Sequence, residues 1–193
     1  MIENLKNYKI FLASQSPRRK ELLTQLRIPF NIVNIRGIDE TYPTDIETDD
    51  IPEYLAIRKA EVYSRNFHSN EMIITADTLV ILNDKVLGKP QNHEEAIKML
   101  EELSGKIHKV ITGVCITTKY KRVSFSSTTE VKFTKMSKSD IEYYVNSYRP
   151  YDKAGAYGIQ EWIGCVAVEW INGSYYNVMG LPVHKLYEKI KEF

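Results

Sequence analysis

The sequence predicts one domain that contains both helices and strands. The chain has 193 residues, which suffice for one substantial core or for two lobes flanking a cleft, but not for several independent domains. Segments with apolar residues at helical spacing and β-branched apolar runs both occur along its length. Because no internal repeat or low-complexity linker separates them, we expect a single domain over residues 1–193.

The N-terminal part of the chain is expected to form two strands and two helices. The apolar run 10–13 predicts a strand, and a helix follows over about 17–27, where Ser16 can cap the exposed amides. A second strand is expected over 30–35, followed by a polar, acid-rich loop. Apolar residues at helical spacing then predict a helix over about 52–67 with one face on the core.

The start of the first helix has the chemistry of an anion site. Pro17 suits the first helical position because its missing N–H has no intrahelical partner. Arg18 and Arg19 then place two cations beside the positive end of the helix dipole, which is unfavourable unless a polyanion lies between them and the amides. A phosphate chain would fit this description, although most arginine pairs are simply solvated.

The middle of the chain is expected to hold the main strands. Nearly unbroken apolar residues predict buried strands over 72–76 and 79–82, and the first of them ends at Asp77. Two longer β-rich stretches, 108–118 and 123–136, are joined by a short polar segment. We expect them to form an antiparallel pair.

Helices are also expected in the second half of the chain. Asn92 and Ser137 are each followed three residues later by an acid, which predicts a capped helix after each of them. An Asn-Gly dipeptide between the runs 165–171 and 174–178 predicts a β-hairpin. A last helix is expected over about 182–191.

Composition excludes several classes of protein. Lys and Arg number 26 and Asp and Glu 25, so the formal net charge of +1 argues against a protein that coats nucleic acid or an acidic membrane. No apolar segment approaches about 18 residues, so no membrane span is expected. Cys115 and Cys165 lie in apolar runs without CxxC spacing, which predicts buried thiols in a reducing compartment and leaves a disulfide open. The predicted location is cytoplasmic.

Several charged residues are candidates for chemistry. Asp77 ends an apolar strand, where a carboxylate is costly to bury unless something uses or pairs it. Asp39 and Glu40 add hard oxygen ligands of the kind that Mg²⁺ or Mn²⁺ prefers. Lys59 on a helix face and Lys89 in a proline-containing turn can deliver positive charge to phosphate. Taken singly, each is explained as well by a paired acid, a loop acid or a solvated lysine.

The stretch 152–160 suits a loop that wraps closely around a flat ligand, because it combines small residues with a ring and an amide. Gln160 could hydrogen-bond the edge of a base, although by composition alone a plain glycine-rich loop is the better explanation. The motifs of other chemistries are missing, including G-x-S-x-G, a complete P-loop, G-x-G-x-x-G after a strand and zinc-ligand spacing.

A set of motifs runs in order along almost the whole chain. They are Ser14-Gln15-Ser16-Pro17-Arg18-Arg19-Lys20-Glu21-Leu22-Leu23, Ile38-Asp39-Glu40, Lys59-Ala60, Ala76-Asp77-Thr78, Gly88-Lys89-Pro90, Leu103-Ser104-Gly105-Lys106, Asp152 through Gln160 and Val178-Met179-Gly180-Leu181-Pro182. This set resembles the Maf family of nucleoside triphosphate pyrophosphatases. Residues 153–160 are similar to the subgroup that acts on dTTP and UTP. Glu161 departs from the family, which commonly has glycine there.

The resemblance implies an inosine-triphosphatase-like, mixed α/β fold: a curved, largely antiparallel sheet flanked by helices, with two lobes and a central cleft. It also implies a homodimer, a nucleoside triphosphate substrate and a divalent metal cofactor, Mg²⁺ or Mn²⁺. By carry-over, Asp77 is the proton acceptor, Glu40 and Asp77 hold the metal, Ser14, Ser16, Arg18, Lys59 and Lys89 bind the triphosphate, and Arg18, Thr78 and Gln160 set specificity.

The implied reaction is hydrolysis of dTTP and UTP, or of modified pyrimidine nucleotides, to the monophosphate and pyrophosphate. This house-cleaning activity carries a suggested link to cell-division arrest. Thymine and uracil share one hydrogen-bonding edge, so the amide of Gln160 could accept both bases and reject cytosine. Two alternatives remain: a pyrophosphatase for 7-methyl-GTP or other modified nucleotides, and a nucleotide-binding regulator of septum formation with little turnover.

Overall fold

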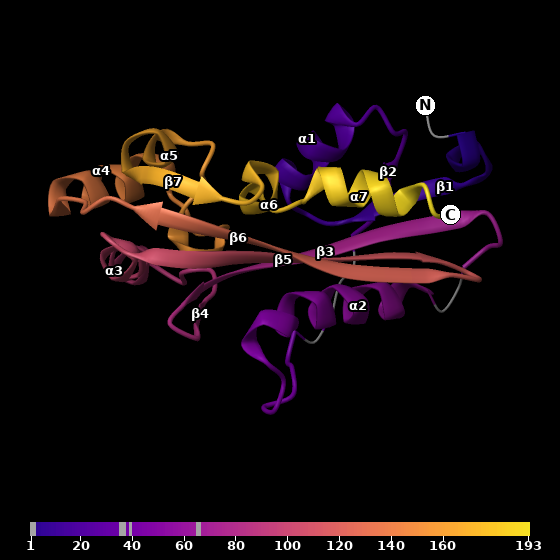
Figure 1. The fold of residues 1–193 in the computed structure, drawn as a ribbon, viewed down its shortest axis with the longest axis horizontal. Coiled ribbons are helices and arrows are strands. Elements are labelled where there is room, and N and C mark those ends of the chain that lie inside the picture. Colours follow the sequence, from indigo (N-terminus) through magenta and orange to yellow (C-terminus); the bar gives the residue numbers. More distant parts are fainter. Residues whose placement is uncertain (1–2, 35–37, 39, 65–66) are drawn as a thin grey trace. The chain divides into compact units, whose positions relative to one another are not determined.

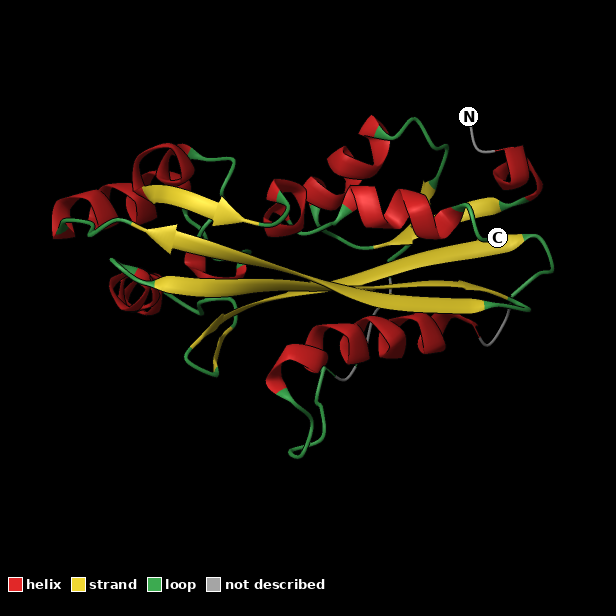
Figure 2. Cartoon of the chain, in the orientation of Figure 1, coloured by secondary structure: helices red, strands yellow, loops and turns green. Residues whose placement is uncertain are grey.

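The computed structural model describes residues 3–34, 38, 40–64 and 67–193. A seven-stranded sheet has the strand order β2-β1-β3-β5-β6-β7, with β4 paired to β3, and helices accompany it (Figures 1 and 2). The strands are β1 (Lys9–Ala13), β2 (Asn31–Ile32), β3 (Glu71–Leu82), β4 (Lys85–Leu87), β5 (Ile107–Thr118), β6 (Arg122–Phe133) and β7 (Val168–Asn172). The helices are α1 (Pro17–Gln25), α2 (Ile51–Ser64), α3 (His93–Leu103), α4 (Lys138–Tyr148), α5 (Trp162–Ala167), α6 (Tyr175–Met179) and α7 (Val183–Ile190). The expected mixed α/β class is confirmed.

The residues group into two compact units. Unit 1 comprises Met1–Asp77, Thr112–Ser127 and Gly180–Phe193, and unit 2 comprises Thr78–Ile111 and Thr128–Met179. Strands β3, β5 and β6 contribute residues to both units, so a unit boundary falls within each of these strands.

Unit 1 is organised by parallel pairing of β1 with both β2 and β3. The β1–β3 register runs from Lys9 opposite Glu71 to Ala13 opposite Thr75. Parallel neighbours require crossover connections, which explains the helices between these strands. Helix α2 covers one face of the strands, and α1 and α7 lie on the opposite face (Figure 1). Residues 72–76 are consequently buried, and this accounts for their nearly unbroken apolar sequence.

Helix α2 packs unusually close to β5. A Cβ atom on Gly113 of β5 would lie 2.2 Å from the backbone of Pro52 and Glu53 in the first turn of α2. The buried hydroxyl of Thr75 donates a hydrogen bond of 2.6 Å to the carbonyl oxygen of Ala56, one turn further along the helix. A glycine on one strand and a threonine on another therefore fix the position of α2, which carries Lys59.

Unit 2 begins with a two-residue turn between β3 and β4. Asn83 and Asp84 have φ angles of 49° and 63°, as a type I′ turn requires, and β4 pairs antiparallel with β3. Helices α3 and α4 pack on each other. The predicted caps are both confirmed, since Asn92 accepts from the amide of Glu95 and Ser137 forms a capping box with Asp140.

The hairpin predicted from the Asn-Gly dipeptide is wrong. The predicted strand 165–171 is divided between α5 and β7, and 174–178 falls mostly in α6. Strand β7 pairs antiparallel with β6 instead. The cause is tertiary: Gly173, at φ 135°, lies against Thr129 of β6, and Ser174 caps α6 by accepting from the amide of Asn177.

Other boundaries differ from the prediction in smaller ways. Within the described part of 30–35, only Asn31–Ile32 pair as a strand. The first helix ends at Gln25, two residues early, and Arg27 has a positive φ of 53°. Strand β3 joins the two predicted apolar runs into one continuous strand that includes Asp77. A charged partner for that carboxylate, described below, explains why the strand can continue.

The cysteine prediction is correct for one of the two residues. Cys115 is buried in β5, whereas Cys165 is exposed on α5, and both are free thiols. Cys165 was expected to be buried because it lies in an apolar run, but it lies on α5 with its residue exposed. Within the described part of the chain, no helix combines the length and the apolar character needed to cross a membrane.

Candidate active site

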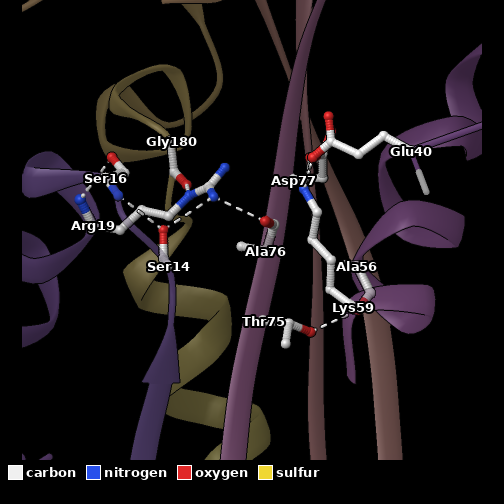
Figure 3. A network of polar contacts seen from close by, with 10 residues as sticks. All are labelled: Ser14, Ser16, Arg19, Glu40, Ala56, Lys59, Thr75, Ala76, Asp77 and Gly180. Carbon is white, nitrogen blue, oxygen red and sulfur yellow. Dashed lines mark hydrogen bonds and ion pairs between the residues drawn. The ribbon is translucent and has the colours of Figure 1, made fainter. Parts of the chain in front are cut away.

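The segment between β1 and α1 forms a compact serine-rich turn. Ser14 Oγ accepts from the backbone N–H of Ser16 at 3.2 Å, and Ser16 Oγ accepts from the backbone N–H of Arg19 at 3.4 Å (Figure 3). Ser16 is therefore the N-cap of α1 and Pro17 occupies its first turn, as predicted. The turn brings two hydroxyl groups to the N-terminus of a nine-residue helix.

Arg19 ties three separate segments of unit 1 together. Its Nε donates to the carbonyl oxygen of Gly180 at 2.8 Å, and its Nη1 donates to the carbonyl oxygen of Ala76 at 2.8 Å and to Ser14 Oγ at 3.4 Å (Figure 3). Burial lowers the pKa of Arg19, whereas the charge of Asp77 raises it. Arg19 thus links the turn after β1, strand β3 and the loop before α7.

Arg18 lies beside this link, and its side chain is partly exposed. Its charge lowers the pKa of Arg19, so the two guanidinium groups are close enough to interact. The two arginines therefore differ in role. Arg19 donates hydrogen bonds to backbone carbonyl groups, whereas Arg18 lies at the turn before α1.

Lys59 joins two acidic residues of the predicted site. Its Nζ lies 2.5 Å from Asp77 Oδ1 and 2.8 Å from Glu40 Oε1 (Figure 3). The side chains of Lys59 and Asp77 are 13% and 14% exposed, whereas that of Glu40 is 59% exposed. The two charges of such a mostly buried pair depend on each other, because removing either one leaves the other uncompensated. Helix α2, strand β3 and the loop after β2 each supply one member.

The two carboxylates suit a divalent cation. Both already contact one ammonium nitrogen, so they converge on a common cationic position. Among the described residues no group of three or more His, Cys, Asp and Glu could hold a metal. Mg²⁺ is commonly bound by one or two carboxylates, with substrate oxygens and water completing its shell, so Glu40 and Asp77 fit such an ion. The predicted acid Asp39 lies outside the described residues.

Strand β3 separates two groups of site residues. Figure 3 shows Ser14, Ser16 and Arg19 on one side of the strand and Lys59 with Asp77 on the other. Thr78 follows Asp77 directly in β3 and is partly buried. Because successive side chains of a strand point to opposite faces, Thr78 is expected on the side opposite Asp77.

The remaining predicted residues belong to unit 2. Lys89 is exposed just after β4, where the carbonyl oxygen of the preceding Gly88 accepts from the backbone N–H of Gly155 at 3.0 Å. Gln160 is exposed in a turn closed by a hydrogen bond of 3.0 Å from the N–H of Glu161 to the carbonyl oxygen of Gly158. The loop that was expected to wrap a ligand is thus connected to the turn that carries Lys89.

Comparisons with known proteins identify the family of the chain. A family model described as Maf-like protein matches residues 9–193. The dTTP/UTP pyrophosphatase of Phocaeicola vulgatus is 54% identical over 192 residues, and that of Parabacteroides distasonis is 56% identical over 193; both alignments cover 100% of each chain. Among solved structures, a nucleoside triphosphatase, dITP/XTP pyrophosphatase, from Mycobacterium abscessus has a TM-score of 0.43 and 11% identity, covering 95% of this chain and 94% of that one. The family match and the full-length identities establish that the chain belongs to the Maf family.

Proposed function

We propose that this chain hydrolyses dTTP and UTP to the corresponding monophosphate and pyrophosphate. Relatives that are more than half identical over their full length carry the name dTTP/UTP pyrophosphatase. The observation that carries the proposal is the Lys59 ammonium held between Glu40 and Asp77, because a phosphoanhydride hydrolase needs a cation, a carboxylate base and a metal position together.

The triphosphate is assigned to the turn before α1 and to the neighbouring cations. Ser14, Ser16 and the N-terminus of α1 supply hydroxyl groups and a favourable dipole. Arg18 and Lys59, both in unit 1, supply the positive charge, and Lys89 is added from the family resemblance alone. Arg19 is left out because its guanidinium donates to two backbone carbonyls.

Glu40 and Asp77 are the residues that would hold Mg²⁺ or Mn²⁺. Such an ion, when bound, neutralises charge on phosphate oxygens. Asp77 orients the attacking water and accepts its proton while the bond between the α-phosphorus and the bridging oxygen breaks. The products are a nucleoside monophosphate and pyrophosphate.

Recognition of the base is assigned to Gln160, with Thr78 and Arg18 contributing to specificity. A side-chain amide offers one donor and one acceptor, which match the N3–H and carbonyl edge shared by thymine and uracil. Cytosine presents the inverted pattern, and a mismatch in a hydrogen-bonding site is strongly rejected.

A nucleotide panel tests the proposal. Pyrophosphate release from dTTP, UTP, CTP and 7-methyl-GTP is measured with Mg²⁺ or Mn²⁺, for the wild type and for Asp77→Asn. Turnover highest with dTTP and UTP that collapses in Asp77→Asn is expected. A preference for 7-methyl-GTP would show that the substrates are modified nucleotides instead of dTTP and UTP. Saturable binding without wild-type turnover would favour the nucleotide-binding regulator.

Homodimerisation, which the family resemblance implies, stays a prediction. The full-length identity to the relatives makes a shared assembly state reasonable to test. Sedimentation velocity of the purified chain, with and without dTTP, distinguishes a monomer from a dimer of 22.4 kDa chains.

A further inference from the structure

Gln160 lies in a tight turn that is anchored by a buried residue. The hydrogen bond from the N–H of Glu161 to the carbonyl oxygen of Gly158 places Ile159 and Gln160 at the two central positions of a β-turn. Ile159 is 6% exposed, whereas Gln160 is exposed. The turn therefore anchors one side chain in the core of unit 2 and presents the next one, an amide, at the surface.

The hydroxyl group of Tyr144 bonds to both ends of this turn. Tyr144 lies on α4 and its residue is fully buried. Its hydroxyl oxygen accepts from the backbone N–H of Gly158 at 3.1 Å, and its proton is donated to Glu161 Oε2. Burial and the Glu161 carboxylate both raise the pKa of Tyr144, so the hydroxyl keeps the proton that it donates. One atom thus connects the first and last residues of the turn to a helix.

Lys153 fixes the other oxygen of the same carboxylate. Its Nζ lies 3.2 Å from Glu161 Oε1 and 2.7 Å from Asp152 Oδ1, and its side chain is 9% exposed. The Glu161 carboxylate is therefore held by Tyr144 on one oxygen and by a buried ammonium on the other. Two charge-assisted contacts from different directions restrict both the rotation and the position of the group.

The Gln160 side chain is packed against this arrangement. A Cβ atom on Gly158 would lie 2.9 Å from Gln160 Nε2 and 3.0 Å from Glu161 Cδ. Because Gly158 has no side chain, both groups can lie against its α-carbon at the start of the turn. A shift of Glu161 would therefore change the packing at Gly158, where Gln160 Nε2 also lies.

We infer that Tyr144 and Glu161 are positioning residues that set base selectivity by holding the Gly158–Glu161 turn, with Lys153 as their charged support. An amide separates thymine and uracil from cytosine only when its donor and acceptor are fixed in place, because a mobile amide can rotate to match either pattern. The inference rests on the proposed role of Gln160. It also gives a function to Glu161, at the position where the family commonly has glycine.

Tyr144→Phe tests the inference, because it removes the bridging hydroxyl and keeps the ring. The KM for dTTP is expected to rise about tenfold, as loss of one well-formed hydrogen bond to a charged group permits. The kcat for dTTP is expected to change less than about twofold, and the preference for dTTP over CTP in kcat/KM to fall about tenfold or more. Tyr143→Phe is the matched control, since Tyr143 is the preceding residue of α4, 52% exposed, with its ring against Trp162.

Substitutions of Glu161 provide a graded series. Glu161→Gln keeps an acceptor for Tyr144 but loses the charge that pairs with Lys153, whereas Glu161→Ala loses both. The dTTP preference is expected to decrease from wild type to Glu161→Gln to Glu161→Ala. Thermal unfolding identifies folded variants, and Glu161→Gln remains informative if Tyr144→Phe does not fold. Equal preferences across the folded series overturn the inference.

Binding measurements keep this result separate from the proposed reaction. The Kd values of α,β-imido dTTP and α,β-imido CTP are measured for wild type, Gln160→Ala, Tyr144→Phe and Tyr143→Phe. A preference lost in both Gln160→Ala and Tyr144→Phe supports the inference even without turnover. A preference lost only in Gln160→Ala overturns the role of Tyr144 alone. A preference unchanged in Gln160→Ala overturns both the proposed base recognition and this inference.

Discussion

The ammonium group of Lys59 lies 2.5 Å from Asp77 Oδ1, although the two residues belong to a helix and a strand that are 18 positions apart. The contact depends on how closely α2 approaches the sheet. Gly113 permits that approach and the hydroxyl of Thr75 holds it. The candidate site is therefore built on backbone packing as much as on its charged residues, and both can be tested.

Asp77→Asn is expected to lower kcat for dTTP by at least about 100-fold, because the amide cannot accept the proton of the attacking water. Binding of α,β-imido dTTP in the absence of metal is expected to persist. Glu71→Gln, at the start of the same strand, is the control and should retain wild-type turnover. A comparable loss of kcat in both variants would show that Asp77 is not the proton acceptor.

Glu40→Gln is expected to weaken the divalent metal more than the nucleotide. The side chain is 59% exposed, so its loss should affect stability little. The metal concentration for half-maximal rate should rise about tenfold, which corresponds to about 1.4 kcal/mol. Asp45→Asn, an exposed acid in the same loop, should leave the metal dependence unchanged. An unchanged metal dependence in Glu40→Gln would show that Glu40 is not a ligand.

Substitution of Arg19 is expected mainly to lower stability, and substitution of Arg18 mainly to weaken substrate binding. Arg19→Ala leaves the carbonyl oxygens of Gly180 and Ala76 without this donor and should cost about 2 kcal/mol of stability. Arg18→Ala should cost less stability but raise the KM for dTTP about tenfold, because a phosphate partner is lost. Chemical denaturation and initial rates on both variants measure the two quantities. If Arg18→Ala lost more stability and Arg19→Ala raised the KM more, Arg19 would be the phosphate partner and Arg18 the structural residue.

The buried His108 should make the free energy of unfolding of unit 2 depend on pH. Burial lowers the pKa of His108 to about 3, and its Nε2 lies 2.8 Å from the hydroxyl oxygen of Tyr157. Below the ordinary histidine pKa of about 6.5 the unfolded chain binds a proton that the folded chain does not. This contribution to stability is therefore present above pH 6.5 and is lost as the pH falls towards 3.

The double variant His108→Phe/Tyr157→Phe tests this dependence, because replacing both partners leaves neither polar group buried alone. Wild type should lose up to about 1.4 kcal/mol per pH unit from this group below pH 6.5, and the double variant should show a correspondingly flatter profile. Urea denaturation between pH 5 and 7 measures the slopes. Tyr157→Phe keeps His108 and should retain the wild-type slope; identical slopes in all three proteins would contradict the assignment.

Local chemistry in the sequence was sufficient to predict where three of the helices begin. Ser16, Asn92 and Ser137 cap their helices as expected because a cap needs only a side-chain oxygen and the amides that follow it. The turn at Gly173 could not be predicted in this way. The backbone conformation at Gly173 depends on Thr129, 44 residues earlier in the sequence. Contact with β6 therefore overrides the local preference for a hairpin.

The same distinction applies to the candidate site. Residue types and family motifs identified Asp77, Lys59 and Glu40, but not that one ammonium would contact both carboxylates. That arrangement requires the close approach of α2 to β3 and β5. The link from Arg19 to Gly180 spans 161 positions and involves a backbone carbonyl, for which a sequence carries no signal.

Gly113→Ala is expected to damage both the fold and the site. Its added Cβ would lie 2.2 Å from the backbone of Pro52 and Glu53, so α2 must move away from β5. Overpacking of this kind costs about 1–3 kcal/mol, and a displaced α2 should also raise the KM for dTTP because it carries Lys59. Gly88→Ala is the matched control, since its Cβ would meet nothing within 4 Å even though the residue adjoins Lys89. Thermal unfolding and initial rates should separate the two variants, and equal stabilities would show that β5 does not hold α2 in place.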